Sequence, residues 1–290
     1  MSIELLVNPR VYLGEGPVWD EQAQLLYWLD IANGLIFAYD PATGRNQSYA
    51  VGQPVGALAL RRSGGFVLAL RDGFAFFDPA TGQLTPIANP ESHLPNNRFN
   101  DGKVDPAGRF WAGTLANNFQ PAAGSLYRLD PDLAVQKLLT GLTISNGLAW
   151  SLDHKTLYFT DTIPGTITAY DYDLASGELG SGRVIIRVPP QLGYPDGLTI
   201  DSDGQLWIAH YGDHCVRRWN PETAEVLETI HLPASQVTSC TFGGPQLDTL
   251  FITTATERMS EADKAREPLA GALFAIRLPY RGLPTNRFNG

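Results

Sequence analysis

Carboxylate and side-chain amide residues recur in short segments that mostly end in glycine. Glu15, Asp101, Asn146 and Asp196 each lie in such a segment, and Asn100 directly precedes Asp101. Oxygen atoms of this kind are the ligands that hard divalent cations prefer. The residue types therefore point to a metal site, provided that the fold brings these distant positions together.

Each of these segments lies about ten residues before a hydrophobic triplet that contains an aromatic residue. The triplets are Leu26-Tyr27-Trp28, Phe66-Val67-Leu68, Phe110-Trp111-Ala112, Leu157-Tyr158-Phe159, Leu206-Trp207-Ile208 and Leu250-Phe251-Ile252, in steps of 40, 44, 47, 49 and 44 residues. Several strands per repeat of roughly 40–50 residues are typical of propeller blades. The sequence thus predicts an all-β fold, a six-bladed β-propeller, with residues 1–290 as a single domain.

The segments between the strands agree with this prediction. Asp40-Pro41-Ala42-Thr43-Gly44 and Asp78-Pro79-Ala80-Thr81-Gly82 have the composition of tight hairpin turns. One short helix is expected from Ser260 to Glu267, because Ser260 and Asp263 have the spacing of a helix cap. We expect the N- and C-terminal segments to share one blade, since this closes the ring without a free edge.

Equivalent positions of the blades lie on a ring around one axis, so Glu15, Asp101, Asn146 and Asp196 should point into one narrow space. Buried carboxylates repel one another unless a cation holds them. The oxygen-rich set suits Ca²⁺, Mg²⁺ or Mn²⁺, and Zn²⁺ or Fe²⁺ also fits a site with open positions. Turn formation would explain any single Asn-Gly or Asp-Gly pair, but it explains Glu15 poorly.

Composition excludes several classes of function. The net charge is −9 and the pI about 5.0, and no clustered basic face for nucleic acid is present. A signal peptide and a membrane-spanning apolar run are also lacking, so we expect a soluble, cytoplasmic protein with a small-molecule partner and no membrane partner. Cys215 and Cys240 should be reduced. His210 and His214 offer a weaker hypothesis, a zinc site.

Several stretches together resemble a known family, over about Leu13 to Leu278. They are Leu13-Gly14-Glu15-Gly16-Pro17, Asn97-Arg98-Phe99-Asn100-Asp101-Gly102-Lys103-Val104-Asp105, Ala112-Gly113-Thr114, Ile144-Ser145-Asn146-Gly147-Leu148-Ala149-Trp150, Pro195-Asp196-Gly197 and Cys240-Thr241-Phe242-Gly243-Gly244. On these stretches the chain resembles the SMP30/gluconolactonase/luciferin-regenerating-enzyme family, which includes regucalcin. The resemblance implies that Glu15, Asn146 and Asp196 hold the metal and that Arg98 and Asn100 contact the substrate.

One departure concerns substrate preference. Animal members of this family carry acidic residues where this chain has Asn117 and Asn118, and the Asn118 amide is expected to bind a sugar hydroxyl instead. The resemblance implies a metal-dependent lactonase that opens aldonolactones such as gluconolactone, xylonolactone or arabinonolactone. Asp196 is the expected base on the resemblance, with Asp101 as the alternative.

Two other functions remain open at the level of sequence. A calcium-binding regulatory propeller without a catalytic role would need the same metal ligands, and so would a phosphotriesterase-like metal hydrolase. A serine hydrolase is not expected, because the chain has no Gly-x-Ser-x-Gly segment.

Overall fold

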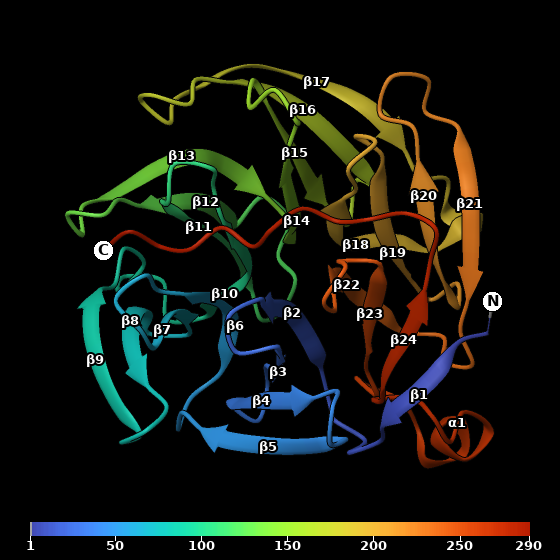
Figure 1. Cartoon of the computed structure of the whole chain (residues 1–290). Coiled ribbons are helices and arrows are strands. Elements are labelled where there is room, and N and C mark those ends of the chain that lie inside the picture. Colours follow the sequence, from blue (N-terminus) through green and yellow to red (C-terminus); the bar gives the residue numbers. More distant parts are fainter. Residues whose placement is uncertain (1) are drawn as a thin grey trace.

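The computed structural model describes residues 2–290 and contains six four-stranded antiparallel sheets arranged around one axis (Figure 1). Blades 1 to 3 are built from β2 (Gly14–Asp20), β3 (Leu25–Asp30), β4 (Leu35–Asp40), β5 (Arg45–Ala50); β6 (Val55–Leu60), β7 (Phe66–Leu70), β8 (Gly73–Asp78), β9 (Gln83–Ala88); and β10 (Asn97–Val104), β11 (Phe110–Ala116), β12 (Gly124–Leu129), β13 (Val135–Leu142). The predicted six-bladed propeller is confirmed.

Blades 4 and 5 follow the same pattern, and blade 6 contains strands from both ends of the chain. They consist of β14 (Ser145–Trp150), β15 (Thr156–Asp161), β16 (Thr166–Tyr172), β17 (Leu179–Arg187); β18 (Tyr194–Ile200), β19 (Leu206–Tyr211), β20 (Cys215–Trp219), β21 (Val226–His231); and β22 (Val237–Gly243), β23 (Thr249–Thr254), β24 (Leu273–Arg277), β1 (Glu4–Val7). A short 3-10 turn at Pro190–Leu192 precedes β18.

The ring closes through the N-terminal strand, as predicted. β1 pairs antiparallel with β24, with Glu4 opposite Ala275 and Leu5 opposite Phe274, and the two strands lie side by side in Figure 1. Pairing the two ends of the chain in one sheet leaves no gap between the first and last blades. The innermost strands β2, β6, β10, β14, β18 and β22 then contact one another in a closed cycle around the axis.

The aromatic residues of the second strands form the core between blades. Trp28 on β3, Trp111 on β11 and Trp207 on β19 are completely buried. Two of these indoles are also held by carboxylates, because Trp111 Nε1 donates to Asp105 Oδ2 and Trp207 Nε1 donates to Asp201 Oδ2, each at 2.9 Å. In blades 3 and 5, these contacts hold the second strand against the turn that precedes it, and so hold the inner strand in place.

The carboxylate of Asp201 has a structural role in the turn between β18 and β19. Its Oδ1 accepts from the backbone N–H groups of Asp203 and Gln205, and its Oδ2 accepts from Trp207 and from Arg218 Nε at 2.7 Å. The aspartate therefore stabilises the turn between β18 and β19, in agreement with the turn chemistry expected from the sequence.

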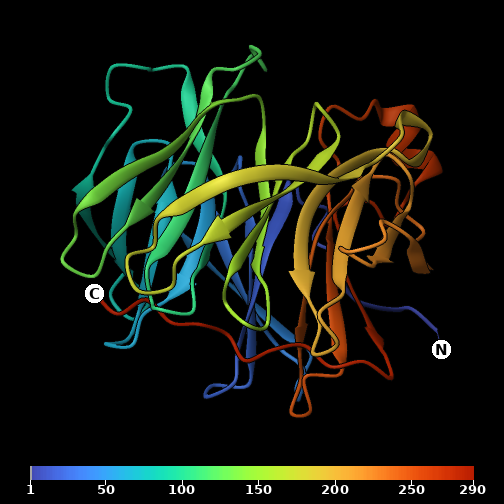
Figure 2. The ribbon, with the colours of Figure 1, turned by 90° about the horizontal axis from the view of Figure 1, so that it is seen from above.

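The C-terminal residues 279–290 cross one face of the ring, which we call the lower face (Figure 2). They bond to five of the six blades: Gly282 N to Leu247 O and Ser202 N to Arg281 O at 2.8 Å, Thr285 Oγ1 to Trp19 O at 2.7 Å, Phe288 N to Leu60 O at 2.8 Å, and Asn289 N to Gly108 O at 3.0 Å. Each inner strand ends at this face and begins at the opposite, upper face. The segment therefore ties the lower ends of the inner strands together.

The predicted helix is present as α1 (Glu261–Arg266), on the upper side of blade 6. Ser260 is its N-cap and forms a reciprocal capping box with Asp263, as the sequence suggested. Within residues 2–290, no helix has the length and apolar character needed to cross a membrane.

The lower segment should contribute substantially to stability. Phe288 is completely buried in the core between blades 2 and 3, with its ring centroid 6.3 Å from that of Phe76. We expect Phe288→Ala to lower the free energy of unfolding by about 3–5 kcal/mol, because it leaves a cavity that the rigid blades cannot fill. Leu227→Ala, at a side chain that is 46% exposed, should change it by less than about 0.5 kcal/mol. Equal effects in chemical denaturation would contradict the anchoring role.

Candidate functional site

The register of the inner strands shows which residues are equivalent around the axis. Each of the inner strands β10, β14 and β18 has a bulge, in which two residues lie opposite one residue of the second strand. Asn100, Asn146 and Asp196 are the first residues of these bulges. Spacing along the chain had placed Asp101 in this ring, but the register shows that Asn100 is the equivalent residue and that Asp101 lies one position lower. In β2 the bulge is formed by Gly16 and Pro17, so Glu15 lies one position before the equivalent residue.

Glu15, Asn146 and Asp196 form the centre of the site, as the sequence predicted, and only 4%, 3% and 7% of their surfaces are exposed. The Asn146 amide is oriented by donation from Nδ2 to Thr162 Oγ1 at 3.0 Å. This bond leaves Asn146 Oδ1 without a hydrogen-bond partner, and Asp196 Oδ1 is also buried without one. Orphaned buried oxygens are rare in proteins and call for an explanation.

The electrostatics of this centre are unfavourable for bare carboxylates. Burial raises the pKa of Glu15 well above its ordinary value, and the nearby charges of Asp196 and Asp101 raise it further. The pKa of Asp196 is raised in the same way, first by burial and then by Asp101, while the amide of Asn146 acts in the opposite direction. Both shifts arise because the charged forms have lost water and face like charges.

A divalent cation fits this arrangement. It would satisfy the two orphaned oxygens and replace the protons that the crowded carboxylates otherwise retain. The set of two carboxylates and one amide consists entirely of oxygen donors, which suits a hard ion. Within residues 2–290, no group of three or more His, Cys, Asp or Glu side chains is placed to hold a metal. The amide of Asn146 is therefore essential to this site, and Asp101 does not complete a three-carboxylate group.

Arg98 and Asn100 lie beside the centre and form one unit. Arg98 Nη1 donates to Asn100 Oδ1 at 2.8 Å and to Phe99 O at 2.9 Å, and Asn100 Nδ2 donates to Ser145 O at 2.9 Å. Burial lowers the pKa of Arg98, and the nearby carboxylates of Glu257 and Glu15 partly offset this. The guanidinium thus stays paired with acceptors on one side and retains donors for a ligand on the other.

A cavity of about 190 Å³ lies above the centre, and Arg98 is part of its wall. Its other polar lining residues are Asn117, Glu257 and Arg258. The Arg258 guanidinium carbon lies 4.4 Å from the centroid of the Phe119 ring, so the loops after β11 and β23 meet across the opening. The sequence analysis missed Glu257, Arg258 and Phe119, because they lie in loops outside the repeat.

The predicted substrate residue Asn118 is not among the residues that line this cavity. It is exposed, and its Oδ1 accepts from Asn96 Nδ2 at 2.9 Å and from Gln120 N at 3.3 Å. The side chain thus stabilises the loop, whereas its neighbour Asn117 contributes to the cavity wall. Sequence alone does not separate the two asparagines, because a turn decides which one faces the cavity.

Asp101 lies on the lower side of the centre, near Lys103. Its Oδ1 accepts from Gly102 N at 2.6 Å. Burial raises the pKa of Asp101, and the charge of Lys103 opposes this shift. The sequence analysis did not assign any role to Lys103, although its place two residues after Asp101 on an inner strand puts both side chains toward the axis.

The histidine pair does not form a metal site. His210 is completely buried, with Nδ1 2.7 Å from Leu192 O and with Nε2 accepting from Trp219 Nε1 at 3.2 Å. Burial lowers the pKa of His210 to about 4. Both ring nitrogens are therefore occupied, and the zinc hypothesis for His210 and His214 is wrong.

Comparisons with known proteins agree with this geometry. Residues 13–256 match the family model described as "SMP-30/Gluconolactonase/LRE-like region". Regucalcin from Xenopus laevis is 40% identical over 296 aligned residues, which cover 100% of this chain and 99% of that protein.

Two solved structures show the same likeness. A calcium-binding protein, regucalcin, from Agrobacterium tumefaciens has a TM-score of 0.96 and 29% identity, covering 100% of this chain and 98% of that one. A gluconolactonase from Xanthomonas campestris has a TM-score of 0.77 and 26% identity, covering 96% of this chain and 89% of that one. With the family model matched over most of the chain, this protein belongs to the SMP-30/gluconolactonase/LRE-like family.

Proposed function

We propose that this protein is a metal-dependent hydrolase that opens sugar-derived lactones to the free acids. The observation that carries the proposal is the pair of orphaned oxygens, Asn146 Oδ1 and Asp196 Oδ1, in a crowded acidic centre beside a small cavity whose wall includes Arg98 and Asn117. Family membership supports it, because the family includes proteins described as gluconolactonases.

Glu15, Asn146 and Asp196 would hold the divalent ion. When bound, such an ion supplies Lewis acidity, which stabilises negative charge on a carbonyl oxygen and lowers the pKa of water. Two carboxylates match the charge of one divalent ion and an amide adds none, so the ion would keep its Lewis acidity. The oxygen donors favour Ca²⁺, Mg²⁺ or Mn²⁺, and Zn²⁺ or Fe²⁺ are alternatives that metal titration would separate.

The upper cavity suits a single-ring substrate with several hydroxyl groups. Its volume of about 190 Å³ is below that of pockets for drug-sized ligands, which is roughly 300–1,000 Å³. Arg98 would donate to ring or chain oxygens, and Asn100 would hold Arg98 in place while its own amide faces the centre. We place Asn117 in the substrate role expected of Asn118, since Asn117 lines the cavity. Five- or six-membered aldonolactones, such as gluconolactone, xylonolactone or arabinonolactone, have this size and polarity.

Hydrolysis requires one proton transfer to and one from the protein. A carboxylate takes a proton from water, the water oxygen bonds to the lactone carbonyl carbon, and the ring C–O bond breaks as the proton passes to the leaving oxygen. We favour Asp196 as the base on the family resemblance, and the Oδ1 of Asp101 already accepts from Gly102 N. Asp101 is the alternative base.

A calcium-binding role without catalysis is the second candidate, and the all-oxygen ligand set is the observation in its favour. The solved Agrobacterium tumefaciens relative is described as a calcium-binding protein. We also propose a cytoplasmic location, since Cys215 and Cys240 are both free and buried. Lactone hydrolysis above the spontaneous rate decides between the catalytic and the purely calcium-binding roles.

Asp196→Ala should lose the metal and the activity together. It removes a carboxylate ligand and the favoured base. Losing a residue that only supports a metal ligand costs about 10- to 100-fold in metal affinity, so loss of the ligand itself should cost more than about 100-fold. Metal content after dialysis and acid release from several lactones measure the two effects. Asp171→Ala, at an exposed position on β16, is the control. A metal-loaded wild type that only matches the uncatalysed rate with every lactone would overturn the lactonase proposal.

Arg98→Met should weaken substrate binding. The change removes hydrogen bonds from a charged donor, so KM should rise about 10- to 100-fold while kcat changes by less than about threefold. Arg45→Met, on the exposed outer strand β5, should leave both constants unchanged. Initial rates over a range of lactone concentrations test this, and a loss confined to kcat would contradict a binding role for Arg98.

The pH dependence of folding stability should differ between the metal-free and the metal-bound protein. The raised pKa values of Glu15 and Asp196 mean that the metal-free folded protein binds more protons than the unfolded chain does. The contribution of these two groups to stability is therefore fully present at or below the ordinary carboxyl values, about 4, and is lost as pH rises toward the raised values. Metal binding replaces the protons and removes this loss.

Thermal unfolding from pH 5 to 7.5, with a chelator or with excess metal, measures this difference. The increase in Tm on adding metal should grow with pH. Asp196→Ala should flatten the slope of the metal-free protein, because it removes one of the two groups. If the metal-induced increase in Tm were the same at every pH in this range, the carboxylates of Glu15 and Asp196 would not be the groups that couple stability to pH.

A further inference from the structure

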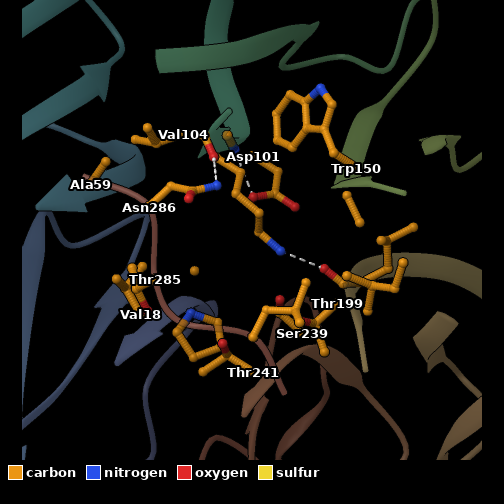
Figure 3. A pocket seen from close by; sticks show the side chains of 18 of the residues that line it. Val18, Ala59, Asp101, Val104, Trp150, Thr199, Ser239, Thr241, Thr285 and Asn286 are labelled. Atoms are coloured by element: carbon orange, nitrogen blue, oxygen red, sulfur yellow. Dashed lines mark hydrogen bonds between the residues drawn. The ribbon is translucent and has the colours of Figure 1, made fainter. Parts of the chain in front are cut away.

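A second cavity lies on the other side of the acidic centre, and of the residues in the proposed reaction only the alternative base, Asp101, lines it. Its volume is about 380 Å³, and its walls come from the lower halves of all six inner strands. Leu283, Pro284, Thr285 and Asn286 of the C-terminal segment form its floor. We call it the lower cavity; Figure 3 shows its side chains surrounding an open space.

The lower cavity is reached from the lower face. Leu152, which is 45% exposed, and Leu283, which is 37% exposed, are both lining residues, so the opening lies between the β14–β15 turn and the C-terminal segment. The two cavities have no lining residue in common. A ligand of the lower cavity can therefore enter without passing the acidic centre.

Most of the lower cavity wall is apolar. Val18, Ala59 and Val104 line it on one side and Trp150 on another (Figure 3). The polar groups of the wall include the hydroxyl groups of Thr199, Ser239 and Thr241, the ammonium group of Lys103 and the carboxylate of Asp101, and Thr285 and Asn286 belong to the floor. A largely apolar wall with a few polar groups, one of them a cation, is typical of sites for small amphipathic molecules.

The ammonium of Lys103 is incompletely satisfied. Its Nζ donates to Leu198 O at 2.7 Å, and an ammonium group has three donors. No Asp or Glu of residues 2–290 forms an ion pair with Lys103. Asp101 is near enough to favour the charged form of Lys103 against the effect of burial, which lowers its pKa. A buried cation with spare donors is costly unless an anion or another acceptor reaches it.

We propose that the lower cavity binds a small organic carboxylate with an apolar body, whose carboxylate accepts from Lys103. The apolar groups of the ligand would pack against Val18, Ala59 and Val104. A polyhydroxy acid, such as the product of lactone opening, fits this site less well, because Val18, Ala59, Val104 and Trp150 would leave several of its hydroxyl groups without partners. The inference does not depend on the lactonase proposal.

Calorimetric titration of the full-length protein with 4-phenylbutyrate tests the proposal. We expect one site with Kd below about 1 mM, which is reasonable for a ligand of this size. The uncharged 4-phenylbutanamide and the hydroxylated gluconate should each bind at least about tenfold more weakly. Undetectable binding of 4-phenylbutyrate at millimolar concentration, or equal binding of the amide or of gluconate, would overturn the assignment.

Variants locate the ligand. Lys103→Met should weaken binding about 10- to 100-fold, because a hydrogen bond to a charged group is lost, while Lys103→Arg should retain most of it. Lys137→Met, at an exposed position on β13, is the control and should bind like the wild type. If Lys103→Met and the control bind equally, the proposal is wrong.

Two further variants keep the test decisive if Lys103→Met does not fold. Thr241→Phe narrows the lower cavity without changing its charge and should also abolish binding; retained binding would contradict the site. Arg98→Met changes only the upper cavity and should leave 4-phenylbutyrate binding unchanged. Loss of binding in Arg98→Met would place the ligand in the upper cavity and overturn the proposal.

Discussion

The packing of Glu15 and Asp196 into one dry, narrow space is the constraint on which the rest of the site depends. Both carboxylates are buried inside the closed cycle of inner strands and have therefore lost most of their contact with water. The cost of burying two like charges must be offset by protons, by a cation or by nearby positive groups. The arrangement of side chains above and below the centre follows from this requirement.

The charged side chains along the axis are arranged in layers that partly offset the cost of burying the carboxylates. Arg98 lies on the upper side, next to the upper cavity, and Lys103 lies on the lower side, next to the lower cavity. Their two positive charges face the three carboxylates of Glu15, Asp101 and Asp196. Neither cation forms an ion pair with these acids within the described residues. The centre therefore still favours an additional cation. The charges of Arg98 and Lys103 stay available to a ligand.

Scaffold and specificity are carried by different parts of the chain. The inner strands are fixed by the Asp–Trp bonds of the blades and by the C-terminal segment across the lower face. The loops that carry Asn117, Phe119, Glu257 and Arg258 meet at the upper face, where the Arg258 guanidinium lies over the Phe119 ring. Changes in these loops alter the shape of the upper cavity at little cost to the blades, which is the usual place for substrate preference to vary.

The sequence by itself determined the number of blades, the closure by the terminal strands and the capped helix, and it predicted that Glu15, Asn146 and Asp196 come together at the axis. It did so because a repeat of strand and turn signals forces equivalent residues onto one axis. Only the tertiary structure decided that Asn100 and not Asp101 is the equivalent ring residue, because a bulge shifts the register by one position and spacing along the chain does not reveal it. It also decided that Asn117 and not Asn118 lines the upper cavity, and that Lys103 faces a second one. These outcomes depend on loop conformation and on contacts between blades, which local sequence patterns do not encode.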